Sequence, residues 1–140
     1  MNARTTALSA LIAVRRQNAW ADGALKEYIA RDRLSRRDAA LAARLVYGVV
    51  QNRLLLDFYL SQVVSGPMSR LQPVMLDILR LGAYQILLLD KIPDSAAVNE
   101  AVEQTKRAGS RAGGLVNAVL RRVAENREKL PEIVKVSDFI

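Results

Sequence analysis

Apolar residues recur along this chain three or four positions apart, and strict alternation of apolar and polar residues never persists for five positions. Each amphipathic stretch therefore predicts a helix that buries one face. The predicted helices span residues 4–19, 24–31, 35–51, 54–64, 73–90, 95–107, and 114–122 and beyond, with a short turn at 69–71. The pattern predicts an all-α fold, a bundle of about seven helices.

Turn and cap residues set the limits of several helices. Asp22–Gly23 predicts a break after the first helix. Ser35 followed by Asp38 matches a capping box at the start of the third helix. Ser65–Pro67 predicts the end of the fourth helix, and Pro73 suits the first turn of the fifth.

The fifth predicted helix, with the sequence VMLDILRLGAYQILLL, is apolar on nearly all sides. This pattern is typical of a helix that is surrounded by others, so we expect it at the centre of the bundle. Its charged residues Asp77 and Arg80 lie three positions apart. We expect them to pair with each other or with neighbours.

Lysine and arginine outnumber the acidic residues by 21 to 14, which gives a net charge of +7. The charge is uneven: +6 over residues 1–53, −1 over 54–94 and +2 over 95–140. Two basic ends favour an anionic partner, most often nucleic acid and sometimes a membrane surface. The apolar content of 51% excludes global disorder.

The chain contains neither cysteine nor histidine. Disulfides, Cys/His zinc sites and Cys–His or Ser–His–Asp catalysis are therefore excluded within it. We recognise no signal peptide, and charged and polar residues interrupt the most apolar segment, Val74–Leu89. We expect a cytoplasmic protein with no membrane partner, no metal and no catalytic residue.

Three arginines, Arg4, Arg15 and Arg16, mark the polar side of the first predicted helix. Guanidinium groups bind phosphate bidentately, and phosphate neutralisation dominates affinity for nucleic acid. A solvated helix face is the competing interpretation, and the sequence leaves both open.

Lys106, Arg107 and Arg111 collect at a glycine-containing joint before the last helix, which itself carries Arg121 and Arg122. Free backbone N–H groups at the start of that helix and three cations can together hold a phosphate. Taken locally, a glycine C-cap with cations at the end of the preceding helix explains the joint better. The spacing does not fit a P-loop, because no Gly-Lys-Ser/Thr follows.

Other polar and aromatic residues receive structural interpretations. We expect Asn99, Glu100 and Asn117 to bond across the last helix pair or to nearby backbone. Trp20 is expected to staple the first helix to the second, with base stacking as the alternative. The tyrosines predicted at the rim of the core are Tyr47, Tyr59 and Tyr84.

Several stretches resemble the NusB-type RNA-binding domain. They are Leu81–Tyr84, Pro93, Val98–Glu103, Val116–Arg122 and the N-terminal ARTTALSALIAV. The resemblance covers about residues 3–127. It implies a NusB-like bundle that binds RNA, with the first helix and the joint before the last helix on one face.

Two kinds of relative compete within this resemblance. One is the stand-alone antitermination factor NusB, which carries a denser arginine run at its start. The other is the N-terminal domain of the RsmB (Sun/Fmu) enzymes, which methylate cytosine C5 in small-subunit ribosomal RNA. Leu45–Val50 and the strings LRLGAYQ and NAVLRR are closer to the second.

The methyltransferase resemblance implies a following Rossmann-like domain that binds S-adenosylmethionine and supplies a cysteine nucleophile, and this chain carries neither. We expect an RNA-binding domain at residues 1–130 and the start of a linker to a missing domain at 131–140. The chain alone is then no enzyme and holds no cofactor. It positions a 16S rRNA cytosine-C5 methyltransferase domain in cis, and a homodimer stays open. The expected RNA contacts are Arg4, Arg15, Arg16, Lys106, Arg107, Arg111, Arg121 and Arg122.

Two alternatives stay open. The chain can be a stand-alone antitermination factor that binds leader RNA and a ribosomal protein. It can also be a helical module whose basic face contacts another protein.

Overall fold

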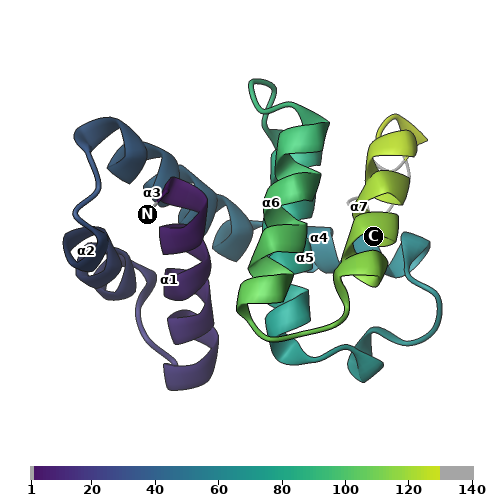
Figure 1. Cartoon of the computed structure of the whole chain (residues 1–140), viewed down its shortest axis with the longest axis horizontal. Helices are drawn as coiled ribbons and strands as arrows, with labels where there is room; N and C mark the ends of the chain where they lie inside the picture. The colour runs from purple at the N-terminus through teal and green to yellow at the C-terminus, as the bar shows by residue number, and fades with distance from the viewer. Residues whose placement is uncertain (1, 130–140) are drawn as a thin grey trace, which may run out of the picture. The chain divides into compact units, whose positions relative to one another are not determined.

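The structure is a computed structural model that describes residues 2–129 (Figure 1). Within these residues the chain forms seven α-helices and a short 3-10 helix, and no strand. The helices are α1 (Ala3–Gln17), α2 (Ala21–Asp32), α3 (Arg36–Gln51), α4 (Arg53–Val63), α5 (Pro73–Leu88), α6 (Asp94–Arg107) and α7 (Gly113–Glu125), with the 3-10 helix at Met68–Arg70. The predicted all-α class and the number of helices are confirmed.

The helices fall into two compact units, one of residues 1–52 and one from Arg53 onward. The proposed linker at 131–140 lies outside the described residues. The domain boundary at residue 130 therefore stays a prediction.

The first unit consists of α1, α2 and α3, which pack against one another. Their facing sides are small or aliphatic: Ala7, Ala42 and Leu45 are completely buried. The predicted cap of α3 is confirmed, because the Ser35 hydroxyl accepts a hydrogen bond from the Asp38 amide at 3.1 Å. These contacts join three short helices that would be marginal in isolation.

The junction between α1 and α2 differs from the prediction. Helix α1 ends at Gln17 because Asn18 adopts the left-handed conformation, with φ of +51°. Helix α2 already begins at Ala21, so Asp22–Gly23 lies in its first turn and is not a break. An aspartate is favourable there, next to the positive end of the helix dipole.

Trp20 is the N-cap residue of α2, and its side chain is 87% exposed. The prediction that it staples α1 to α2 is wrong. The early start of α2 leaves Trp20 in the connection, outside the packed faces of both helices.

In the second unit, α5 contacts α4, α6 and α7. Eleven of its sixteen residues are buried, which confirms its predicted central position. Gly82 faces α7: a Cβ atom there would lie 2.6 Å from Leu120 Cδ1, too close for a carbon–carbon contact. The missing side chain lets α5 and α7 approach each other.

Arg80 is one of two buried charged residues of α5, and its side chain is 9% exposed. Its guanidinium contacts Asp57 of α4 through two bonds, Nε to Oδ1 at 2.6 Å and Nη2 to Oδ2 at 3.0 Å. Asp77 lies farther away, at 3.8 Å from Nη1. Arg80 thus pairs with neighbours as predicted, and the closer partner comes from another helix.

The three tyrosines divide. Tyr59 and Tyr84 are buried in the second unit, whereas Tyr47 is 37% exposed in the first. Only Tyr47 therefore occupies the predicted rim position. No helix among the described residues combines the length and the apolar character needed to cross a membrane.

Candidate functional site

Helices α6 and α7 lie side by side and are joined by a short connection (Figure 1). Gly109 in this joint has φ of +75°, a conformation that glycine adopts without steric cost. Its amide donates to the Lys106 carbonyl at 2.9 Å, and the Ser110 amide donates to the Thr105 carbonyl at 3.1 Å. The glycine C-cap predicted for the joint is confirmed.

Two of the predicted contact residues at the joint are paired along α6. Lys106 Nζ lies 3.5 Å from a Glu103 carboxylate oxygen, and Arg107 Nη2 lies 3.2 Å from one of Glu100. Both members of the Lys106–Glu103 pair are exposed, so this pair contributes about 0–1 kcal/mol to stability. In the other pair Arg107 is exposed, whereas the Glu100 side chain is only 17% exposed.

Arg111 is the exposed cation inside the joint, and no ion pair of its side chain is found within residues 2–129. The cap at Gly109 ends α6 before Arg111, and α7 begins two residues after Arg111. Its charge is therefore available to an anion from outside the molecule.

The cations of α7 are held by uncharged groups. Arg121 Nε donates to Asn117 Oδ1 at 3.1 Å, one turn earlier in the same helix. Arg122 Nη1 donates to the Val63 carbonyl at the end of α4, at 3.0 Å. Because neither bond involves a carboxylate, no anion in these contacts compensates the charge of either guanidinium group.

Two of the three polar residues singled out on α6 and α7 have structural contacts, although not the predicted ones. Glu100 and Asn117 bond to arginines along their own helices and not across the helix pair. Asn99 is exposed, and no hydrogen bond of its amide is found among the described residues.

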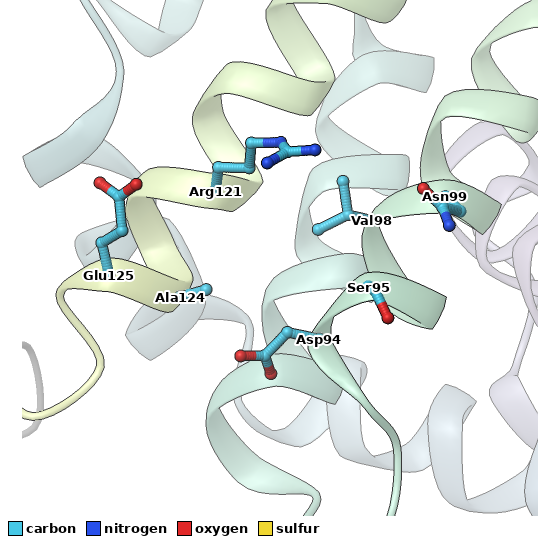
Figure 2. A pocket seen from close by; sticks show the side chains of 7 residues that line it. All are labelled: Asp94, Ser95, Val98, Asn99, Arg121, Ala124 and Glu125. Atoms are coloured by element: carbon cyan, nitrogen blue, oxygen red, sulfur yellow. The ribbon is translucent and has the colours of Figure 1, made fainter.

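Two hollows follow the α6–α7 face and share Asn99. One of about 250 Å³ has Val98 and Ala124 as its apolar floor, and Figure 2 shows the Arg121 side chain extending from α7 toward α6 above it. The other, of about 400 Å³, lies at the start of α7 beside Gly113 and Gly114. No periodicity in the sequence predicts these hollows, because the crossing of the two helices creates them.

Carboxylates occur at both hollows: Asp94 and Glu125 at the first and Glu103 at the second. Asp94 is in turn paired with Arg127. Negative charge makes the hollows poor phosphate sites. The exposed cations beside them are the better candidates.

The first unit contains Arg4, Arg15 and Arg16, all on α1. Arg16 is exposed in the last turn, whereas Arg4 and Arg15 are partly buried and engaged in interactions within the chain. The sequence does not distinguish these three arginines as phosphate contacts, whereas the packing of α1 leaves only Arg16 exposed. That they form one face with the joint stays a prediction.

Asp32 attaches the start of α1 to the end of α2. Its carboxylate accepts hydrogen bonds from Arg31 Nε at 2.8 Å and from the Thr6 hydroxyl at 2.7 Å. The Arg31 contact is the main reason that the pKa of Asp32 lies below its usual 3.8, and the Thr6 bond adds to the effect. Asp32 raises the pKa of Arg31 in return, so this arginine stays protonated and its charge is compensated by a carboxylate within the chain.

Asp22 in the first turn of α2 accepts a hydrogen bond from the Tyr47 hydroxyl of α3. This bond is the main cause that raises the pKa of Tyr47 above 10.0, since only the protonated hydroxyl can donate it. The contact holds the Tyr47 ring next to the start of α2.

Comparison with known proteins gives one family. A sequence model described as the NusB family matches residues 1–125. The probable ribosomal RNA small subunit methyltransferase B of Bacillus subtilis is 38% identical over 136 residues, which cover 96% of this chain and 30% of that protein. The transcription antitermination protein NusB of Ruminiclostridium cellulolyticum is 32% identical over 124 residues, 87% of this chain and 86% of that protein.

The fold agrees with these matches. A solved structure of T. maritima NusB superimposes with a TM-score of 0.82 at 26% sequence identity, covering 93% of this chain and 94% of the other. The chain spans about 30% of the length of the methyltransferases that it matches.

Proposed function

Because the chain belongs to the NusB family, we propose that it is an RNA-binding module that positions a 16S rRNA cytosine-C5 methyltransferase domain on its substrate. The observation that carries the RNA-binding part is the joint between α6 and α7. There Arg111 is exposed without an ion pair among residues 2–129, and further cations flank it on both helices.

The electrostatics of helices α6 and α7 support the phosphate backbone of RNA as the ligand. Arg121 and Arg122 are held by neutral oxygens, so their charge is not cancelled. The exposed Lys106–Glu103 pair is weak enough for phosphate oxygens to compete with the glutamate, and the Arg107 guanidinium is itself exposed. Phosphate binding releases condensed counterions, which drives association at low salt.

The methyltransferase role rests on the relatives that share 38% identity across almost the whole chain but are about three times as long. In this proposal the rest of such a protein supplies S-adenosylmethionine binding and the chemistry. The described residues form helices only, so they lack a Rossmann-like sheet, and we assign none of them to the cofactor. The catalytic domain is then a partner in cis.

A second candidate is a stand-alone antitermination factor that binds leader RNA and a ribosomal protein. The observation that favours it is the NusB protein at 32% identity, of which this chain spans 86%. Both candidates predict RNA binding through the same cations, so they differ in the RNA preferred.

RNA binding is tested by measuring Kd for 16S rRNA fragments and for an antitermination leader RNA across a salt series. We expect tighter binding to the rRNA fragments, and a log–log salt dependence with a negative slope. Replacing Arg107 and Arg111 together by alanine should make that slope shallower by roughly 2, about 1 for each phosphate that the protein no longer neutralises.

Arg70→Ala, an exposed arginine of the 3-10 helix, is the matched control and should bind like the unmodified chain. Binding that is immeasurable at low salt, or unchanged in the double variant, would contradict RNA binding through the joint. Tighter binding to the leader RNA would favour the antitermination candidate.

A further inference from the structure

Trp20 is the only tryptophan in the chain, and its side chain is 87% exposed. It makes no side-chain capping bond to α2, although it occupies the N-cap position. An aromatic side chain usually buries 150–250 Å² on folding and contributes strongly to packing. Because the Trp20 side chain stays exposed, it buries almost no surface area when the first unit folds.

The residues close to Trp20 in the chain, and one that is bonded to them, supply a second aromatic ring and positive charge. The hydroxyl of the partly exposed Tyr47 donates a hydrogen bond to Asp22, two residues after Trp20. Arg44 precedes Tyr47 by three residues and therefore shares its helix face. Arg16 lies four residues before Trp20 in the last turn of α1.

Arg16 and Arg44 are both exposed, and no ion pair of either is found within residues 2–129. The first unit as a whole carries nine lysine and arginine residues against four acidic ones. The surface that presents Trp20 is therefore in a positively charged part of the chain, which suits a polyanion.

A protein partner fits these observations less well. Stable protein interfaces bury about 800 Å² on each partner, far more than one tryptophan can supply. The residues that flank Trp20 in the chain, 16–18 and 22–23, are exposed polar residues and a glycine. Exposed aromatic rings among polar groups and cations are instead typical of proteins that stack the bases of single-stranded RNA.

We propose that Trp20 stacks on an unpaired RNA base, with Arg16 and Arg44 contacting the neighbouring phosphates. This inference rests on the proposed function and adds to it a second contact region, in the first unit, that selects single-stranded over duplex RNA. Stacking on an aromatic face tolerates any base, so the contact recognises unpaired structure and not sequence.

Because Trp20 is the only tryptophan, the fluorescence of the unmodified full chain reports on this site directly. The probes are an oligouridine of about twelve nucleotides, a fully paired RNA duplex, and heparin, a polyanion without bases. We expect the oligouridine to quench the emission on binding. Heparin and the duplex should bind through charge and leave the emission nearly unchanged.

The matching variants are Trp20→Ala and Trp20→Phe. Trp20→Ala should raise the Kd for oligouridine roughly tenfold, while Trp20→Phe, which keeps a stacking face, should stay within about threefold. Leu54→Ala is the control, because Leu54 is apolar and 85% exposed but lacks a ring. Circular dichroism checks that each variant folds.

Three outcomes would overturn the inference. If oligouridine binds without quenching and Trp20→Ala binds equally well, the stacking contact is wrong while the proposed function stands. If no RNA binds under any salt condition, the proposed function fails and the inference with it. If the emission shifts to the blue with rising protein concentration and without RNA, a second copy of the chain covers Trp20 instead.

Discussion

Arg80 and Arg111 carry the same charge and lie in the same unit, yet the fold uses them in opposite ways. Arg80 is buried on α5 and forms two hydrogen bonds to Asp57 of α4. Its charge is compensated by this carboxylate, and the pair links the two helices. Arg111 is exposed between α6 and α7, with no ion pair found among the described residues. Formal charge therefore overstates the charge that a partner can contact.

The largest effect is expected for Arg80→Ala. The substitution removes one member of a mostly buried pair and leaves Asp57 partly desolvated, so the free energy of unfolding should fall by about 3 kcal/mol. Asp57 keeps some contact with water, which places the loss at the lower end of the range for buried pairs. Urea denaturation measures it, with Arg70→Ala as the exposed control. A loss under about 1 kcal/mol would contradict the structural role given to Arg80.

Asp32→Asn tests an intermediate case, since Asp32 is nearly buried but its partner Arg31 is half exposed. We expect the free energy of unfolding to fall by about 2 kcal/mol at neutral pH, because charge-assisted hydrogen bonds from Arg31 and Thr6 are weakened.

The pH dependence of the Asp32 contribution has a definite sign. The folded pKa lies below the usual 3.8, so the stabilisation is fully present above that value and is lost as the pH falls through the folded pKa. Denaturation curves of the two proteins should therefore converge below about pH 4. A stability difference that stayed constant down to pH 2 would show that Asp32 acts through packing alone.

Arg121→Ala and Asn117→Ala compare the loss of an exposed cation with the loss of the neutral side chain that bonds to it. Removing the Arg121 cation should weaken RNA binding about threefold at low salt, whereas removing its Asn117 partner leaves the charge in place and should change Kd less than twofold. Stability should change by less than about 0.5 kcal/mol in Arg121→Ala. Equal losses of binding in both variants would mean that the position of the guanidinium, and not its charge, matters.

The smallest effect is expected for Glu103→Gln. The change removes the carboxylate near Lys106 and should strengthen RNA binding by about twofold, with stability changed by less than about 0.5 kcal/mol. Salt-dependent Kd measurements check it. Weaker binding in this variant would indicate that Glu103 itself contacts the ligand.

The helices were largely predictable, because each amphipathic stretch has to bury its apolar face, and caps such as Ser35 mark where that burial begins. The candidate site was predictable only as a set of basic residues. Periodicity placed Arg107 and Arg111 at one joint, but it contained no sign that Arg107 contacts Glu100 and that no such contact is found for Arg111 within residues 2–129.

Residue types at local spacing were enough to predict the helix order, the central position of α5 and the basic character of the joint. Only the tertiary structure showed which charges are compensated by a carboxylate. It alone also showed which side chains remain outside the packed faces. Arg80 meets Asp57 from a different helix, and Trp20 is exposed because Asn18 ends α1 before it. Such contacts depend on distances between segments remote in the chain, which no local pattern encodes.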